Sequence, residues 1–102
     1  MPEVNGRDIR MVVIACDAGM GSSVMVASQM RNRLKKYDVA VEHVSVNLIP
    51  ADAQVVVCHA GLAQRAQGIA PAAVVVPFQI FMGDPAFERV EAAIRDGGSL
   101  AS

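Results

Sequence analysis

The chain has 102 residues, of which 53% are hydrophobic and 19% charged, and its 9 Lys and Arg nearly balance its 10 Asp and Glu. This composition excludes an intrinsically disordered chain and disfavours a strongly basic nucleic-acid-binding protein. Because only 4% of the residues are aromatic and Trp is absent, the chain offers little material for stacking on bases or on sugar rings.

The first ten residues are polar, and the apolar run after them is too short for a secretory signal or a membrane span. We therefore expect a cytoplasmic protein that does not insert into the membrane. The two cysteines, Cys16 and Cys58, do not make a disulfide framework, and neither has the closely spaced second cysteine of a zinc ribbon. We expect neither a metal ion nor a cofactor.

The first predicted strand covers residues 10–15, a short run rich in β-branched residues that suits a strand buried on both faces. A Gly-rich turn follows it. From Ser23 apolar residues recur at helical spacing, which predicts an amphipathic helix with Ser22 and Ser23 available as caps. The residues expected on its buried face are Val24, Ala27, Met30 and Leu34.

Three more strands are predicted along the chain. Residues 39–46 alternate imperfectly between apolar and polar, as in a half-exposed edge strand. Residues 53–58 and 72–77 are short apolar runs bounded by turn residues, which is typical of buried strands.

Two more helices are predicted between and after these strands. One covers residues 61–67 and is ended by Gly68 and Pro71. The other covers residues 85–95, with Asp84 as its N-cap and Gly97 and Gly98 ending it. We expect the tail, residues 99–102, to be loose.

Helices that alternate with buried β-branched strands are typical of a largely parallel α/β sheet covered on both faces. We expect a single domain over residues 1–102 with an ordered core of about residues 10–96. An antiparallel α+β domain is the alternative. Open parallel sheets bind ligands at the carboxyl ends of their strands, so the functional residues are expected at that edge.

The most unusual segment comes directly after the first predicted strand. It consists of Cys16, Asp17, Ala18, Gly19, Met20, Gly21, Ser22 and Ser23. A strand, a loop with two glycines and a helix N-terminus direct several backbone amides to one point, where they favour a phosphate dianion. The loop lacks the Walker lysine and the G-x-G-x-x-G spacing, which disfavours a nucleotide.

Cys16 is the first residue of this loop, so we expect its sulfur at the rim of the amide cradle. The same amides stabilise negative charge on sulfur, which makes a thiolate nucleophile available for attack on phosphorus. A nearby carboxylate would disfavour negative charge on the sulfur and on a phosphate. We therefore expect the Asp17 side chain to point outward or to accept hydrogen bonds from loop N–H groups. The alternative for Cys16 is an inert, packed cysteine.

A cysteine in a phosphate-binding loop serves either a phosphatase or a phosphoryl carrier. Phosphatases of the C-x5-R-[S/T] kind place an arginine six residues after the nucleophile to stabilise the transition state, and that position is Ser22 here. The sequence therefore favours a cysteine that holds a phosphoryl group until an acceptor arrives. A small cysteine-dependent phosphatase or arsenate reductase is the second hypothesis, and a module that only senses phosphate is the third.

Residues 12–23 resemble the phosphorylation-site loop of the mannitol-class enzyme IIB domains of the bacterial sugar phosphotransferase system. The resemblance extends over residues 10–95. It implies a four-stranded parallel sheet in the order 2-1-3-4 with three helices. This is a Rossmann-like three-layer sandwich related to low-molecular-weight tyrosine phosphatases.

By this resemblance, Cys16 is the phosphocysteine and residues 17–23 are its cradle. Cys16 would accept phosphate from the phosphohistidine of a IIA protein and pass it to a sugar, a mannitol-like hexitol or related carbohydrate, held by the membrane-embedded IIC component. The resemblance implies no nucleic-acid partner. Members often have His-Arg after the third strand, whereas here His59 is followed by Ala60.

Two residues near the end of the third predicted strand have open roles. His59 lies beside the first strand if the order is 2-1-3-4, so it is a possible accessory residue for the thiolate or the loop. Cys58 is expected to be packed, although a Cys16–Cys58 disulfide is conceivable under oxidation because neighbouring strands are close. Strand alternation prevents Cys58 and His59 from pointing to the same site.

Overall fold

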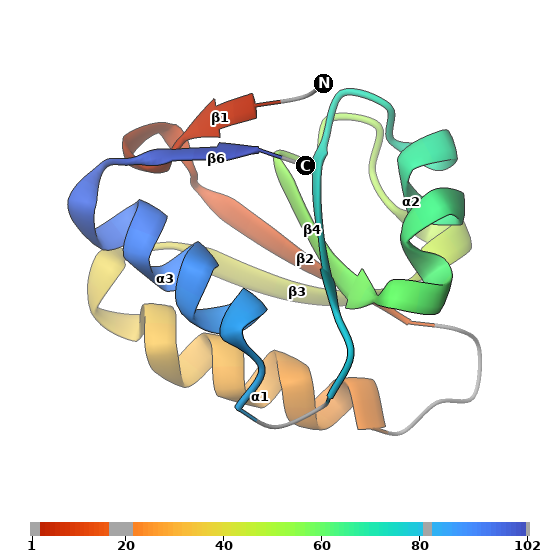
Figure 1. Cartoon of the computed structure of the whole chain (residues 1–102), viewed down its shortest axis with the longest axis horizontal. Helices are drawn as coiled ribbons and strands as arrows, with labels where there is room; N and C mark the ends of the chain where they lie inside the picture. Colours follow the sequence, from red (N-terminus) through yellow and green to blue (C-terminus); the bar gives the residue numbers. More distant parts are fainter. Residues whose placement is uncertain (1–2, 17–21, 81–82, 102) are drawn as a thin grey trace.

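A computed structural model describes residues 3–16, 22–80 and 83–101 of the chain. Within them the main sheet has four parallel strands, ordered β3, β2, β4 and β5 (Figure 1). Their bounds are β2 Met11–Cys16, β3 Ala40–Ser45, β4 Val55–His59 and β5 Val74–Phe78. Counted along the chain, these strands have the order 2-1-3-4, so the expected topology is confirmed.

Three α-helices cover this sheet in the described part of the chain, and they make the three-layer α/β sandwich that was predicted. The helices are α1 Ser22–Leu34, α2 Ala63–Ile69 and α3 Pro85–Asp96. Helices α1 and α3 lie on one face and α2 on the other (Figure 1). Short 3-10 turns connect the elements: η1 Gly6–Asp8, η2 Lys35–Tyr37, η3 Val46–Leu48 and η4 Ala60–Leu62.

The core consists of two apolar clusters separated by the sheet. Val12 and Ile14 of β2 belong to the cluster under α1 and α3, whereas Val13 and Ala15 belong to the cluster under α2. Successive side chains of a strand point to opposite faces, so one short apolar run serves both clusters. This explains why β2 and β4 are continuous apolar runs, while β3, an edge strand, is partly exposed as predicted.

Helix α1 buries a slightly different face from the one predicted. Ala27, Met30 and Leu34 are fully buried, as expected, but Val24 is 55% exposed, and Val26 is buried in its place. The prediction for Val24 was wrong because the buried stripe begins with Val26 and Ala27, which point to the sheet. An ion pair of 2.8 Å between Arg33 and Glu91 joins this helix to α3.

Helix α2 runs one residue past the predicted stop at Gly68. The N–H of its C-cap, Ala70, donates to the carbonyl of Ala66 at 2.9 Å. The side-chain amide of Gln67 donates to the carbonyls of Ala70 and Ala73 just beyond the helix end. These contacts, which composition does not reveal, end the helix at Ile69 instead of at the glycine.

The segments at the two ends of the described chain pair with each other, which corrects the expectation of a loose tail. Strand β6, Ser99–Ala101, pairs antiparallel with β1, Glu3–Asn5. Leu100 is 3% exposed and belongs to the core under α3. Helix α3 ends as predicted at Gly97, whose φ of 69° is in the left-handed region.

Candidate functional site

Cys16 is the last residue of β2, at the carboxyl edge of the sheet and between β3 and β4. Its side chain is 8% exposed, and its thiol donates to the carbonyl of Val44 on β3 with an Sγ to oxygen distance of 3.5 Å. The sulfur is thus held at the edge where parallel sheets place their ligands and is shielded from most solvent.

The loop that follows lies outside the described residues. Its members are Asp17, Ala18, Gly19, Met20 and Gly21, and the side chains of Ser22 and Ser23 are likewise not described. The cradle and the orientation of Asp17 therefore stay predictions. The structure describes both flanks of the loop: β2 ends at Cys16, and the thirteen-residue helix α1 begins at Ser22.

His59 ends β4 and lies on the same face of the sheet as Cys16. The register pairs Ala15 with Cys58, so the next residues along the two strands, Cys16 and His59, both point to the side of α1 and α3. The ring of His59 packs edge-on against Phe78, with centroids 5.9 Å apart, and its Nδ1 accepts the N–H of Gly61 at 3.1 Å. In the neutral ring this bond leaves the proton on Nε2. The structure thus brings His59 to the edge expected for an accessory residue.

Cys58 lies on the opposite face and is fully buried in the cluster under α2. Burial raises the pKa of the Cys58 thiol to about 11, because the thiolate would lose its hydration. A Cys16–Cys58 disulfide is incompatible with this register, since the two side chains leave the sheet in opposite directions. Cys58 is a packing residue, as expected.

Asp84 has a larger role than the N-cap that the sequence predicted. One carboxylate oxygen accepts the N–H of Ala86 and caps α3, which confirms the prediction. The other oxygen accepts the N–H groups of Gln79 and Ile80, just after β5, at 2.9 Å and 3.2 Å. The sequence signal was an Asp-Pro pair shortly after a strand, but it does not reveal that the carboxylate also binds the strand end.

Large apolar side chains are exposed near the carboxyl edge of the sheet. In the described part of the chain, the exposed large hydrophobic residues are Val24 at 55%, Met25 at 47%, Leu48 at 71% and Ile80 at 54%. Each follows the carboxyl end of a strand of the main sheet, namely β2, β3 or β5. At the opposite edge, by contrast, the polar side chain of Gln54 binds the backbone of Arg10 and Asp8.

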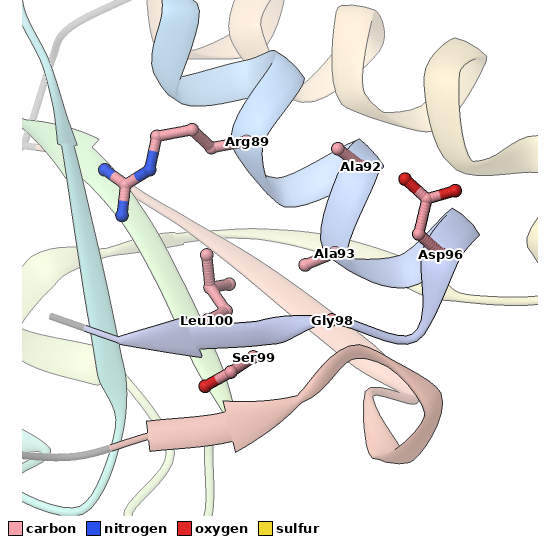
Figure 2. Close-up of a pocket in the computed structure, with 7 residues that line it drawn as sticks. All are labelled: Arg89, Ala92, Ala93, Asp96, Gly98, Ser99 and Leu100. Atoms are coloured by element: carbon pink, nitrogen blue, oxygen red, sulfur yellow. The ribbon is translucent and has the colours of Figure 1, made fainter.

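A surface pocket of about 330 Å³ lies elsewhere, between α3 and β6 (Figure 2). Arg89, Asp96 and Ser99 contribute its polar groups. It lies toward the C-terminal end of α3, away from the carboxyl edge that holds Cys16. We do not assign it to the site.

The fold and the cysteine together define an α/β sandwich of the low-molecular-weight tyrosine phosphatase type. Residues 11–93 match the family described as PTS system, Lactose/Cellobiose specific IIB subunit. The chain belongs to this family of enzyme IIB components of the sugar phosphotransferase system, which are phosphotransferases.

Curated relatives are also sugar phosphotransferase components and confirm the mannitol-class resemblance, whereas the family description names lactose and cellobiose. The chain is 36% identical over 90 residues to the mannitol-specific EIICB component of Bacillus subtilis (strain 168). The aligned residues cover 86% of this chain and 19% of the relative. It is 39% identical over 89 residues to the mannitol-specific EIICB component of Staphylococcus aureus (strain COL), covering 84% and 17%. The chain thus spans less than a fifth of the length of these relatives. No described helix is long and apolar enough to cross a membrane.

Proposed function

We propose that this chain is a phosphoryl carrier that accepts phosphate on Cys16 from the phosphohistidine of a IIA protein and passes it to a sugar held by a membrane IIC component. In the first step the Cys16 thiolate attacks phosphorus, the S–P bond forms, the N–P bond breaks, and the histidine nitrogen keeps the electron pair. In the second step a sugar hydroxyl attacks phosphorus, the O–P bond forms and the S–P bond breaks. The hydroxyl proton passes to solvent, and sulfur keeps the electron pair, which regenerates the thiolate.

The observation that carries this proposal is the place of Cys16. It ends a central strand, only residues 17–21 separate it from the N-terminus of α1, and its thiol lies at the edge of the sheet. Amides of residues 17–23 would hold the equatorial oxygens of the phosphoryl group during transfer, and the positive end of the α1 dipole would add to this stabilisation. His59, on the same face, is the proposed accessory residue.

The partners are proposed from the names of the relatives. Those proteins are called mannitol-specific EIICB components, so we propose that this chain works with a IIC component at the cytoplasmic side of the membrane. A mannitol-like hexitol is the proposed sugar class, and residues 1–102 are proposed to form one IIB domain. The sugar itself contacts IIC, where specificity resides.

Hydrolysis is the competing reaction for a cysteine in such a loop. A phosphatase of this fold needs a guanidinium six residues after the nucleophile, and this chain has Ser22 there. Without that charge, water attack on the phosphocysteine is poorly stabilised. A carrier needs this slow hydrolysis, because the phosphoryl group has to survive until the acceptor binds.

Exchange of each cysteine tests the proposal. The purified chain is incubated with a IIA protein carrying radiolabelled phosphohistidine, as wild type, Cys16→Ser and Cys58→Ser. We expect label on the wild type and on Cys58→Ser and none on Cys16→Ser, with unchanged circular dichroism. Labelling of Cys16→Ser at the wild-type level, or rapid release of free phosphate by the wild type, would refute the carrier role.

A further inference from the structure

The carboxylate of Asp84 ties the end of β5 to the beginning of α3. Its Oδ2 accepts two backbone N–H groups, from Gln79 and Ile80, and its Oδ1 accepts a third from Ala86 at 2.8 Å. The two oxygens therefore have separate tasks. Oδ1 caps the helix, whereas Oδ2 fixes the backbone that follows the strand.

The segment that Oδ2 fixes carries an exposed apolar side chain. Ile80 is 54% exposed, although Phe78, two residues earlier, is buried and packs against Phe87 and the ring of His59. Phe78 anchors the segment from inside, and Asp84 anchors it from the loop. The position of Ile80 is thereby set from both sides.

Ile80 shares its edge of the sheet with the proposed phosphorylation site. The exposed side chains of Val24, Met25 and Leu48 follow strands that end at this same edge. Single exposed hydrophobic residues are ordinary, but a group of them around one edge is typical of a surface that contacts another protein. Any protein that brings phosphohistidine to Cys16 has to cover this edge, because the nitrogen and the sulfur must approach within bonding range of one phosphorus.

We propose that Asp84 is a positioning residue for phosphoryl transfer, which holds Ile80 where it contacts the phosphohistidine protein that donates to Cys16. The proposal rests on the carrier role proposed above. Transfer requires only a weak and transient complex, so a small apolar surface with a polar rim is sufficient.

The two tasks of Asp84 can be separated by a single substitution. In Asp84→Asn the side-chain oxygen still caps α3, since asparagine is a good N-cap. Its amide group, however, is a donor and faces the donors of Gln79 and Ile80, so the backbone after β5 is released. Ile80→Ser removes the apolar contact directly. Asn5→Ala is the matched control, because it removes a cap that accepts the N–H of Arg7 in η1, away from this edge.

The test measures initial rates of phosphoryl transfer from a phosphorylated IIA protein over a range of donor concentrations. We expect Asp84→Asn and Ile80→Ser to raise KM for the donor about fivefold to tenfold, as truncation of an interface contact does, with kcat nearly unchanged. Asn5→Ala should keep the wild-type KM. Alkylation of Cys16 by iodoacetamide should keep its rate in all variants, since a small reagent needs no docking surface.

Other outcomes of this experiment would overturn the inference. Wild-type KM in Asp84→Asn, or an equal rise in Asn5→Ala, would overturn the inference while the carrier role stands. A defect confined to onward transfer from Cys16 to the sugar would also overturn it, because the surface would then serve IIC instead of the donor. A wild type that accepts no phosphate would remove the carrier role and the inference with it.

Discussion

The two cysteines illustrate how one residue type receives two roles from its position in a strand. Cys16 ends β2 at the carboxyl edge, where its thiol reaches the carbonyl of Val44. Cys58 lies one residue before the end of β4 and faces the interior under α2. Sequence alternation predicted this difference in part, since Cys58 and His59 had to point to opposite faces.

Selective alkylation checks this difference. A pKa of about 11 leaves about one in a thousand Cys58 thiols ionised near pH 8, and the side chain has no access to solvent. We therefore expect iodoacetamide to modify Cys16 in the native protein and to modify Cys58 only after unfolding, as read by mass spectrometry of the peptides. Modification of both at equal rates in the native protein would show that the interior under α2 is open.

Asp84 gives the stability of the protein a pH dependence. Burial raises the pKa of Asp84, but hydrogen bonds from the N–H groups of Ala86, Gln79 and Ile80 outweigh it and hold the pKa below its ordinary value. The folded protein thus binds this proton more weakly than the unfolded chain does. The stabilisation is complete above the unfolded pKa and is lost as pH falls through the lower folded pKa.

Urea unfolding of wild type and Asp84→Ala at two pH values tests whether the stabilisation by Asp84 is lost as the pH falls. Near pH 7 we expect the variant to be less stable by about 0.5 to 2 kcal/mol, the usual value of an N-cap. The difference should shrink in acid, as the pH falls through the lowered folded-state pKa of Asp84 and the wild-type carboxylate becomes protonated too. A difference that is constant over this range would mean that the charge of Asp84 contributes nothing.

At the residue scale, the sequence predicted where Cys16 lies but not the contacts around Asp84. The position of Cys16 followed from a β-branched run that ends in a Gly-rich segment. The bonds of Asp84 to Gln79 and Ile80 did not follow, because they depend on how the chain turns between β5 and α3.

At the scale of elements, local sequence patterns predicted those strands and helix limits that depend on interactions between residues close in the chain. Short β-branched runs gave the four main strands, and Asp84 and Gly97 gave the limits of α3. The pairing of β1 with β6 was missed because both strands have only three residues and are joined by contacts across almost the whole chain. The exposed face of α1 was misjudged at Val24, since helical spacing alone does not fix the rotation of a helix on its sheet.

Substitution of two glycines, Gly6 and Gly68, tests how closely the elements pack. A side chain at Gly6 would collide with the backbone carbonyl of Ala93 in α3, and the N–H of Gly6 donates to the carbonyl of Gly98 at 2.7 Å. A side chain at Gly68, inside α2, would meet nothing within 4 Å.

We therefore expect opposite results from the same substitution at these sites. Gly6→Ala should lower the free energy of unfolding by about 1 to 3 kcal/mol through overpacking. Gly68→Ala should raise it by up to about 1 kcal/mol, because alanine is the better helix former. Urea denaturation measures both. Equal effects would contradict the close approach of η1 to α3.

At the scale of the whole molecule, the strand order brings the residues with proposed functional roles to one edge of the sheet. Because β2 lies between β3 and β4 and all four strands are parallel, Cys16 and His59 meet at one edge, and the exposed Ile80 follows β5 at the same edge. Periodicity predicts strands and helices but not their order. The order came from the family resemblance, and the register then showed that Cys16 and Cys58 cannot be bridged.

The most direct measurement is to locate the phosphoryl group itself. The chain is phosphorylated by a IIA protein, digested, and analysed by mass spectrometry with phosphorus NMR of the intact sample. We expect one PO3 group, with the chemical shift of a thiophosphate ester, on the peptide that contains Cys16. Phosphate on a histidine or on Cys58, or an unmodified Cys16 beside a dephosphorylated donor, would contradict it.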